Sequence, residues 1–318
     1  MKDQTAHHYS RRRFLAAAAA VMAGISFLPR HLFADQESPV ITLRTAAATA
    51  KITIQKLRGN ISVLEGSGGN ILILMGKDGK VLVDAGITAS RPRITEGLDS
   101  LSSDPVKHLI NTHWHFDHTD GNEWLHSIGA EIIAHENTRK HLSETTRVEA
   151  WNFTFPPSPR GALPTTVITG PRKLELNSAT IALDHYGASH TDLDIWVNFT
   201  QADILHVGDT WWNGYFPFID YNTRGSINGM IRAAETNLAK TTAKTIVIPG
   251  HGPVGDRAGL VEFRDMLVAV RDKVAALKKQ GKPLPEVIAA KPIAEFDSKW
   301  GGFVIDGKTF TQLVYAGV

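Results

Sequence analysis

Short hydrophobic runs, separated by glycine-containing turns, recur along the chain from about residue 50 onward. Runs of this length bounded by turn residues are typical of β-strands. In chain order, we expect strands over residues 52–57, 60–64, 71–75, 81–84, 106–111, 131–134, 166–168, 172–176, 179–184, 195–200, 204–207 and 245–248. The strands fall into two groups, which predicts two β-rich halves.

Helical segments lie between and after these strands. We expect helices over residues 90–101, 120–127 (with Asp120 as its cap), 136–144, 226–239 and 256–279. The last helix carries an apolar stripe that predicts a face packed on the core, formed by Leu260, Phe263, Leu267, Val270, Val274 and Leu277. The proline- and aromatic-rich residues 151–164 predict a loop. Strands and helices in this order predict a mixed α/β sandwich.

The first 34 residues have the composition of an export signal. Residues 10–15 resemble the twin-arginine signature, and the alanine-rich run over residues 14–28 is too short for a comfortable membrane span. We therefore expect cleavage near Ala34, a periplasmic location and no stable membrane insertion afterwards. An uncleaved amino-terminal anchor is the alternative.

The rest of the chain fits one domain. Residues 35–50 are polar and rich in alanine and threonine, which predicts a flexible lead-in. Residues 51–318 are enough for one large α/β domain with a well-buried core. Its C-terminal helical extension, from residue 283 onward, is expected to add one or two short helices.

The net charge of +2 belongs largely to the signal. Residues 1–34 hold five of the 34 Lys and Arg residues and one of the 32 Asp and Glu residues. The remaining 29 basic and 31 acidic residues leave no electrostatic footprint for nucleic acid. We expect a small-molecule substrate and no nucleic-acid partner.

Three histidines and one aspartate fall within six residues, as His113, His115, Asp117 and His118. The whole 318-residue chain has only 14 histidines, so this density is unusual. Neutral imidazole and carboxylate are ligands that zinc prefers. The sequence has no cysteine, which excludes disulfides and thiolate ligands. The cluster therefore predicts a metal site with nitrogen and oxygen ligands.

Three later segments complete a recognisable series, residues 189–192 (Ser-His-Thr-Asp), 206–210 (His-Val-Gly-Asp-Thr) and 248–252 (Ile-Pro-Gly-His-Gly). Together with the His-x-His-x-Asp-His cluster, they resemble the metallo-β-lactamase superfamily over roughly residues 50 to 255. The resemblance implies a four-layered αβ/βα sandwich with the site at one sheet edge.

The resemblance also implies two metal ions. His113, His115 and His190 would bind the first zinc, and Asp117, His118 and His251 the second. Asp209 would bridge both ions. Asp84, at the end of a predicted strand, resembles the family's aspartate that supports the metal loop; a plain turn carboxylate is its alternative. Iron is an alternative to zinc.

Hydrolysis is the chemistry that this ligand set implies. Two cations lower the pKa of a shared water and polarise a carbonyl, and Asp117 and Asp209 would be the catalytic carboxylates that orient the nucleophile or transfer a proton. The aspartate at position 209 resembles the branch that cleaves esters and lactones, so we expect an ester, lactone or amide substrate. The alternatives are a β-lactamase, an iron-dependent sulfur oxidoreductase and a non-catalytic metal-binding protein.

Aromatic residues gather in two segments, 151–155 and 211–216. With residues 67–70 they would wall a pocket for an apolar or ring-containing substrate. Packing of these rings between loop and sheet explains the pattern equally well, so the sequence does not decide the substrate.

Overall fold

Two β-sheets lie at the centre of the molecule, for which a computed structural model describes residues 38–318. The first sheet has the order β1-β2-β3-β4-β5-β6-β9. Its strands are β1 Thr53–Lys56, β2 Ile61–Glu65, β3 Ile71–Leu74, β4 Lys80–Val83, β5 Val106–Ile110, β6 Glu131–His135 and β9 Thr166–Ile168. Strands β1 to β4 are antiparallel, and β4, β5, β6 and β9 are parallel.

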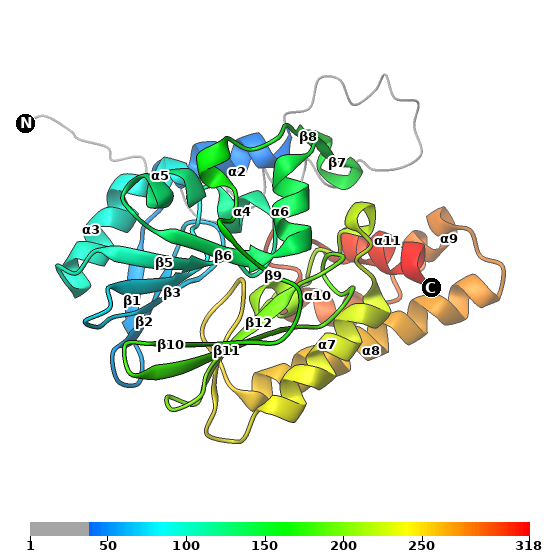
Figure 1. Ribbon diagram of the computed structural model, residues 1–318. Coiled ribbons are helices and arrows are strands. Elements are labelled where there is room, and N and C mark those ends of the chain that lie inside the picture. The colour runs from blue at the N-terminus through cyan, green and yellow to red at the C-terminus, as the bar shows by residue number, and fades with distance from the viewer. Residues whose placement is uncertain (1–37) are drawn as a thin grey trace, which may run out of the picture.

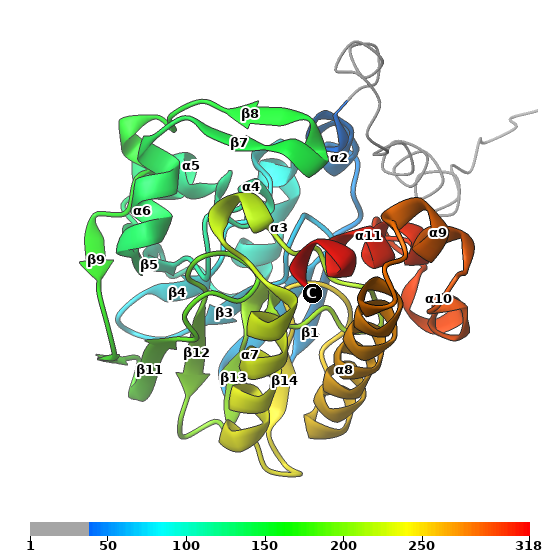
Figure 2. The same ribbon diagram turned by 90° about the vertical axis from the view of Figure 1, so that its right-hand side faces the viewer.

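The second sheet has the order β10-β11-β12-β13-β14. Its strands are β10 Arg172–Leu176, β11 Ala179–His185, β12 Ile195–Phe199, β13 Ile204–His206 and β14 Ile246–Ile248. The first four are antiparallel, and β14 pairs in parallel with β13. A separate hairpin of β7 (Thr146–Val148) and β8 (Phe153–Phe155) lies near helix α2 (Pro39–Ala47), as Figure 2 shows.

Helices cover the outer face of each sheet (Figure 1). Helices α3 (Arg91–Leu101) and α5 (Asn122–Ser127) lie on the first sheet, and α7 (Ile227–Lys240) and α8 (Arg257–Lys279) on the second. The other helices are α4 Phe116–Thr119, α6 Glu136–Ser143, α9 Leu284–Ala289, α10 Ala294–Trp300 and α11 Gly307–Gly317. Single 3-10 turns span Thr88–Ser90, Glu149–Trp151, Arg160–Ala162, Gly208–Thr210 and Tyr221–Thr223.

Three apolar clusters hold these layers together. One lies between the sheets and joins Val63 and Leu72 to Val197 and Phe199. The others fill the space between each sheet and its helices. Burial of apolar surface on both faces of both sheets gives the order helix, sheet, sheet, helix. The predicted four-layered αβ/βα sandwich is confirmed.

The C-terminal extension is larger than the sequence pattern indicated. Helix α8 buries most of its predicted stripe, although Leu277 is only half-buried. Three short helices, α9 to α11, follow it instead of one or two. The side chain of Asp306 accepts a hydrogen bond from Thr309 N and so caps α11.

Three further elements differ from the expectations. Helix α2 lies within the segment expected to be a flexible lead-in; Ser38 caps it, and Val40 and Ala47 are buried. Asp120 ends α4 instead of capping α5, since its carboxylate binds Arg44 and the backbone of Thr88. The expected loop 151–164 contains β8, which pairs with β7.

The predicted signal over residues 1–34, its cleavage near Ala34 and residues 35–37 of the lead-in lie outside the described residues. Within residues 38–318, no helix combines the length and the apolar character needed to cross a membrane.

Candidate metal centre

Loops at the ends of strands bring the predicted metal ligands together. The loop after β5 and the short helix α4 carry the His-x-His-x-Asp-His cluster. His190 lies between β11 and β12, and Asp209 and His251 follow β13 and β14. Because β13 and β14 are parallel, the residues that follow them emerge at the same edge of the sheet.

The seven side chains form two groups. The first group is His113, His115, His190 and Asp209, and the second group is Asp117, His118 and His251. Within each group, the potential ligand atoms lie within 4.8 Å of one another. All seven residues that the sequence singled out as metal ligands are therefore neighbours, and their binding of a metal remains a prediction.

Asp209 lies between the two groups. Its Oδ2 is 3.4 Å from His190 Nε2, and its Oδ1 is 3.1 Å from His118 Nε2. Oδ2 is also 3.4 Å from His251 Nε2. A carboxylate in contact with imidazoles of both groups has the position that a bridging ligand requires.

Acceptor groups outside the centre fix two rings of the first group. His115 Nε2 donates to Asp220 Oδ2 at 3.1 Å, and His190 Nδ1 donates to the Phe218 carbonyl at 2.8 Å. The ring nitrogens on the inner side, His115 Nδ1 and His190 Nε2, are only 2.9 Å apart. Burial lowers the pKa of His190, so this ring is neutral at neutral pH. Two lone pairs at that distance repel one another unless they share a cation.

A hydrogen-bond chain connects the two groups from behind. His113 Nδ1 donates to Thr112 Oγ1 at 3.0 Å, because that hydroxyl gives its proton to Asp84 Oδ2 at 2.8 Å. His118 Nδ1 donates to the same Asp84 oxygen at 2.7 Å. These hydrogen bonds fix the tautomers of both rings so that each Nε2 faces the centre.

Asp84 contacts the metal loop as the sequence predicted. It is fully buried, has a φ of 65°, and also accepts a hydrogen bond from Thr112 N at 2.8 Å. The left-handed backbone is unusual for a residue other than glycine. The three hydrogen bonds to its carboxylate account for its presence in this turn.

Buried polar atoms without a hydrogen-bond partner point into the centre. They include His113 Nε2, His118 Nε2, His251 Nε2 and Asp209 Oδ1. Unpartnered buried atoms of this kind are costly in a folded protein. Three imidazole nitrogens and a carboxylate oxygen that share one space fit a metal ion such as zinc or iron.

Two glycines allow the backbone to approach these ligands. A Cβ atom on Gly250 would lie 1.8 Å from Asp209 Oδ1, and one on Gly69 would lie 2.2 Å from the His118 ring. The loop of Gly69 is tied to the His251 loop because Asn70 donates from its side chain to Pro249 O and Gly252 O, both at 2.9 Å. The loop over residues 67–70 thus supports the ligands, and its Ser67 and Asn70 are buried.

The charges of the centre favour ionised Asp209. Burial acts to raise the pKa of this carboxyl, but His251, His118 and His190 hold it well below its usual range. Burial acts to lower the pKa of His251, while Asp209 and Asp117 raise it to about 9. The Asp209 carboxylate and the His251 imidazole therefore stabilise each other in their charged forms.

The seven side chains differ in exposure. Asp117 and His251 are 14% and 7% exposed, whereas the side chains of the first group are at most 2% exposed and His118 is fully buried. Asp117 and His251 therefore lie nearest to solvent.

Both predicted aromatic segments reach the centre. The ring of Trp151 lies 4.8 Å from that of His115, and the ring of Trp212 lies 4.4 Å from that of His251. Trp211 and Phe216 are fully buried and belong to the core, so packing accounts for part of the aromatic pattern.

Sequence reasoning missed Asp220, Thr112 and Phe303. Asp220 holds His115 across 105 residues of sequence and also accepts hydrogen bonds from Thr223. Phe303, in the C-terminal extension, has its ring 5.9 Å from that of His251. None of the three belongs to a recognisable motif; only the position of Thr112 beside the cluster was a signal.

Comparisons with known proteins agree with this fold. A metallo-β-lactamase from Pontibacter korlensis matches with a TM-score of 0.56 at 19% identity, over 68% of this chain and 99% of that chain. The DIM-1 metallo-β-lactamase matches with a TM-score of 0.54 at 21% identity, over 68% and 97%. A double mutant of the sec-alkyl sulfatase PisA1 reaches a TM-score of 0.65 at 14% identity, over 95% of this chain and 61% of that chain. The family model described as the metallo-β-lactamase superfamily matches residues 59–251, and the chain belongs to this superfamily.

Proposed function

We propose that the protein is a hydrolase that binds two zinc ions and cleaves a carbonyl ester, lactone or amide. The observation that carries the proposal is the position of Asp209, whose two oxygens face imidazoles of both groups. The first group would hold one ion and the second group the other. A pair of bound zinc ions would supply hydroxide at neutral pH and polarise the substrate carbonyl.

The chain's own residues prepare the reaction. Asp220 and the Phe218 carbonyl orient two rings of the first group, and Asp84 orients His118. Asp117 is the most exposed of the seven side chains, and its Oδ2 lies 3.2 Å from His251 Nε2. We assign to its carboxylate the transfer of a proton from the nucleophile to the leaving group.

Metal analysis and substrate assays test this function. We expect two zinc ions per chain by plasma mass spectrometry and hydrolysis of an aryl ester or a lactone. His115→Ala should abolish the activity. Asp203→Asn is a suitable control, since Asp203 is 41% exposed and bonds Arg58 and Thr245 outside both groups.

The same assays separate the alternatives. Turnover of a β-lactam without ester hydrolysis would favour a β-lactamase, and the fold likeness to two metallo-β-lactamases makes that assay necessary. A sulfate ester belongs in the panel because the alkyl sulfatase structure covers most of this chain. One iron with oxygen uptake would favour oxidative sulfur chemistry, and a protein without metal would refute the proposal.

Export to the periplasm is part of the same proposal. Residues 10–15 (Ser-Arg-Arg-Arg-Phe-Leu) support it. Amino-terminal sequencing of the periplasmic protein should find cleavage near Ala34. Replacing both Arg11 and Arg12 by lysine should retain the full-length chain in the cytoplasm, whereas Arg13→Lys should not. Equal export of both variants would contradict a twin-arginine route.

A further inference from the structure

The C-terminal extension reaches the metal centre through a single loop. The backbone N–H of Phe216 donates to the carbonyl of Trp300, at the end of α10, at 2.8 Å. The ring of Phe216 also stacks on that of Phe310 in α11, with centroids 4.7 Å apart. These contacts fix the aromatic segment 211–216 to the extension, and the loop between α10 and α11 then carries Phe303 to the centre.

Phe303 contacts His251, a predicted ligand of the second group. Its ring centroid lies 5.9 Å from those of His251 and Trp212 and 4.8 Å from that of Tyr215. Phe303 and Tyr215 are only half-buried, unlike Trp212. Both rings are therefore partly exposed to solvent next to the buried ring of His251.

A second pair of aromatic rings contacts the first group. Trp151, from the turn between β7 and β8, stacks on Phe218 with centroids 4.8 Å apart, and it also contacts His115. Trp151 is half-buried as well. Aromatic rings from two segments that lie far apart in the sequence therefore contact the centre.

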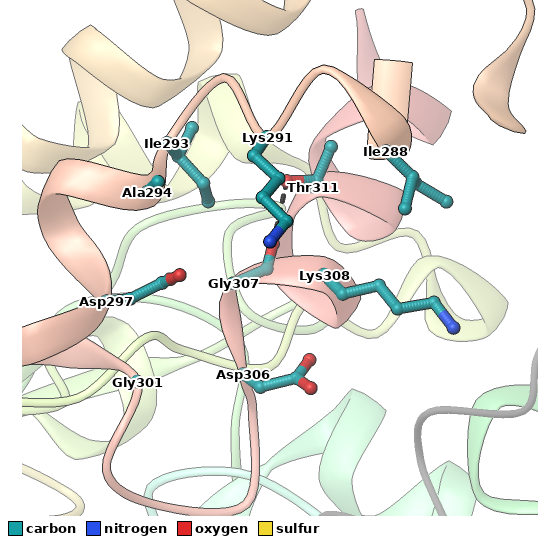
Figure 3. Close-up of a pocket in the computed structure, with 10 residues that line it drawn as sticks. All are labelled: Ile288, Lys291, Ile293, Ala294, Asp297, Gly301, Asp306, Gly307, Lys308 and Thr311. Atoms are coloured by element: carbon teal, nitrogen blue, oxygen red, sulfur yellow. Dashed lines mark hydrogen bonds between the residues drawn. The ribbon is translucent and has the colours of Figure 1, made fainter. Parts of the chain in front are cut away.

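A cavity of about 380 Å³ lies in the extension, at the base of the Phe303 loop (Figure 3). Its lining includes Gly301 and Gly307, the residues at the two ends of the loop, together with Asp297. It contains none of the seven predicted ligands, so it is separate from the metal centre. A Cβ atom on Gly307 would lie 1.9 Å from Asp297 Oδ1, so α11 begins in close contact with α10. That contact fixes one end of the loop.

We propose that Phe303 is a specificity-determining residue that holds an aromatic group of the substrate beside the bond to be cleaved. Tyr215 and Trp212 are its partners. Offset or edge-to-face contacts with an aromatic ligand are favourable at such centroid distances, and a linear alkyl group covers less of the same faces. The statement that the aromatic group belongs to a substrate rests on the proposed function. Binding of an aromatic ligand by Phe303 can be measured whether or not the protein turns over a substrate.

Calorimetry on the purified, metal-loaded protein tests the inference by measuring its affinity for two small carboxylate ligands. Phenylacetate carries a ring, and butyrate carries an alkyl chain on the same anionic group. We expect the wild type to bind phenylacetate more tightly. Phe303→Ala should weaken phenylacetate about 5- to 10-fold and butyrate less than about 2-fold. Phe303→Leu keeps most of the volume and should show the same selectivity loss if the alanine variant does not fold.

Phe296→Ala is the matched control. Phe296 is another half-buried phenylalanine of the extension, and it has no ring contact with a ligand of either group within residues 38–318. Three results would overturn the inference. The Phe303 variants could weaken the binding of phenylacetate and butyrate equally, or Phe296→Ala could cause the same selective change. The third is a wild type that shows no preference for phenylacetate. Selective weakening in a protein that hydrolyses no test substrate would refute the proposed function and leave this inference standing.

Discussion

The first group and the second group differ in their exposure and in their outer contacts. The first is at most 2% exposed, whereas Asp117 and His251 of the second are 14% and 7% exposed. Rings of the first group are fixed by Asp220 and by the Phe218 carbonyl. A rigid, buried ligand set loses little conformational freedom on binding, and an open one leaves room for substrate. We therefore expect the first group to retain its metal more tightly and the second to meet the substrate.

Removing the charge of Asp209 should have the largest effect, because this carboxylate contacts both groups. Asp209→Asn should lower kcat/KM on the order of 10³-fold and reduce metal content in both groups. Steady-state kinetics and plasma mass spectrometry measure the two outcomes. Asp203→Asn is the control. A variant that loses metal from only one group would show that Asp209 is not shared.

Deleting one ligand from each group tests the difference in binding strength. His115→Ala leaves the buried carboxylate of Asp220 without its imidazole, at a cost of about 1–3 kcal/mol. We expect the melting temperature to fall by roughly 3–10 °C and the retained metal to become labile to chelators. His251→Ala removes a side chain that is 7% exposed, more than any side chain of the first group, so it should lose one metal ion with a smaller change in melting temperature. Equal changes in the two variants would contradict the comparison.

The fold could be predicted from sequence because its signals are local. Short apolar runs bounded by glycine gave the strands of both sheets, and the stripe on α8 gave its buried face. Helix α2 was missed because only a Ser-Pro start marks it, and its stability comes from contacts such as that of Arg44 with Asp120. Hairpin β7-β8 was missed because β7 has only one apolar residue and β8 lies in the proline- and aromatic-rich segment that predicted a loop.

The candidate site divides in the same way. The clustering of the seven predicted ligands could be predicted because their motifs resemble those of a known family, and their binding of metal stays a prediction. Asp220 and Phe303 could not, since their importance depends on tertiary contacts with His115 and His251. An aspartate or phenylalanine without a motif looks the same in sequence whether it faces a metal centre or the solvent.

Neutralising the outer carboxylate of each group should have a moderate effect. Asp220→Asn and Asp84→Asn keep the shape of the side chain but weaken the hold on His115 and His118. Each should reduce metal affinity about 10- to 100-fold, as measured by competition with a fluorescent chelator. Asp220→Asn should act on the tightly held metal. Asp84→Asn should act more strongly on the labile one, because Asp84 bonds His118 directly and reaches His113 only through Thr112. The reverse assignment would contradict the difference between the groups.

Thr112→Val should have the smallest effect and should act on both groups at once. The Thr112 hydroxyl accepts from His113 of the first group and donates to Asp84, which holds His118 of the second. Valine has nearly the same shape as threonine but cannot form these hydrogen bonds. We therefore expect metal affinity to fall about 3- to 10-fold in both groups. Thr138→Val is the matched control, because Thr138 is equally buried and its hydroxyl has no hydrogen-bond partner among the described residues. A loss of metal affinity confined to one group would mean that the ligands of the two groups are oriented independently, despite the hydrogen bonds that connect them.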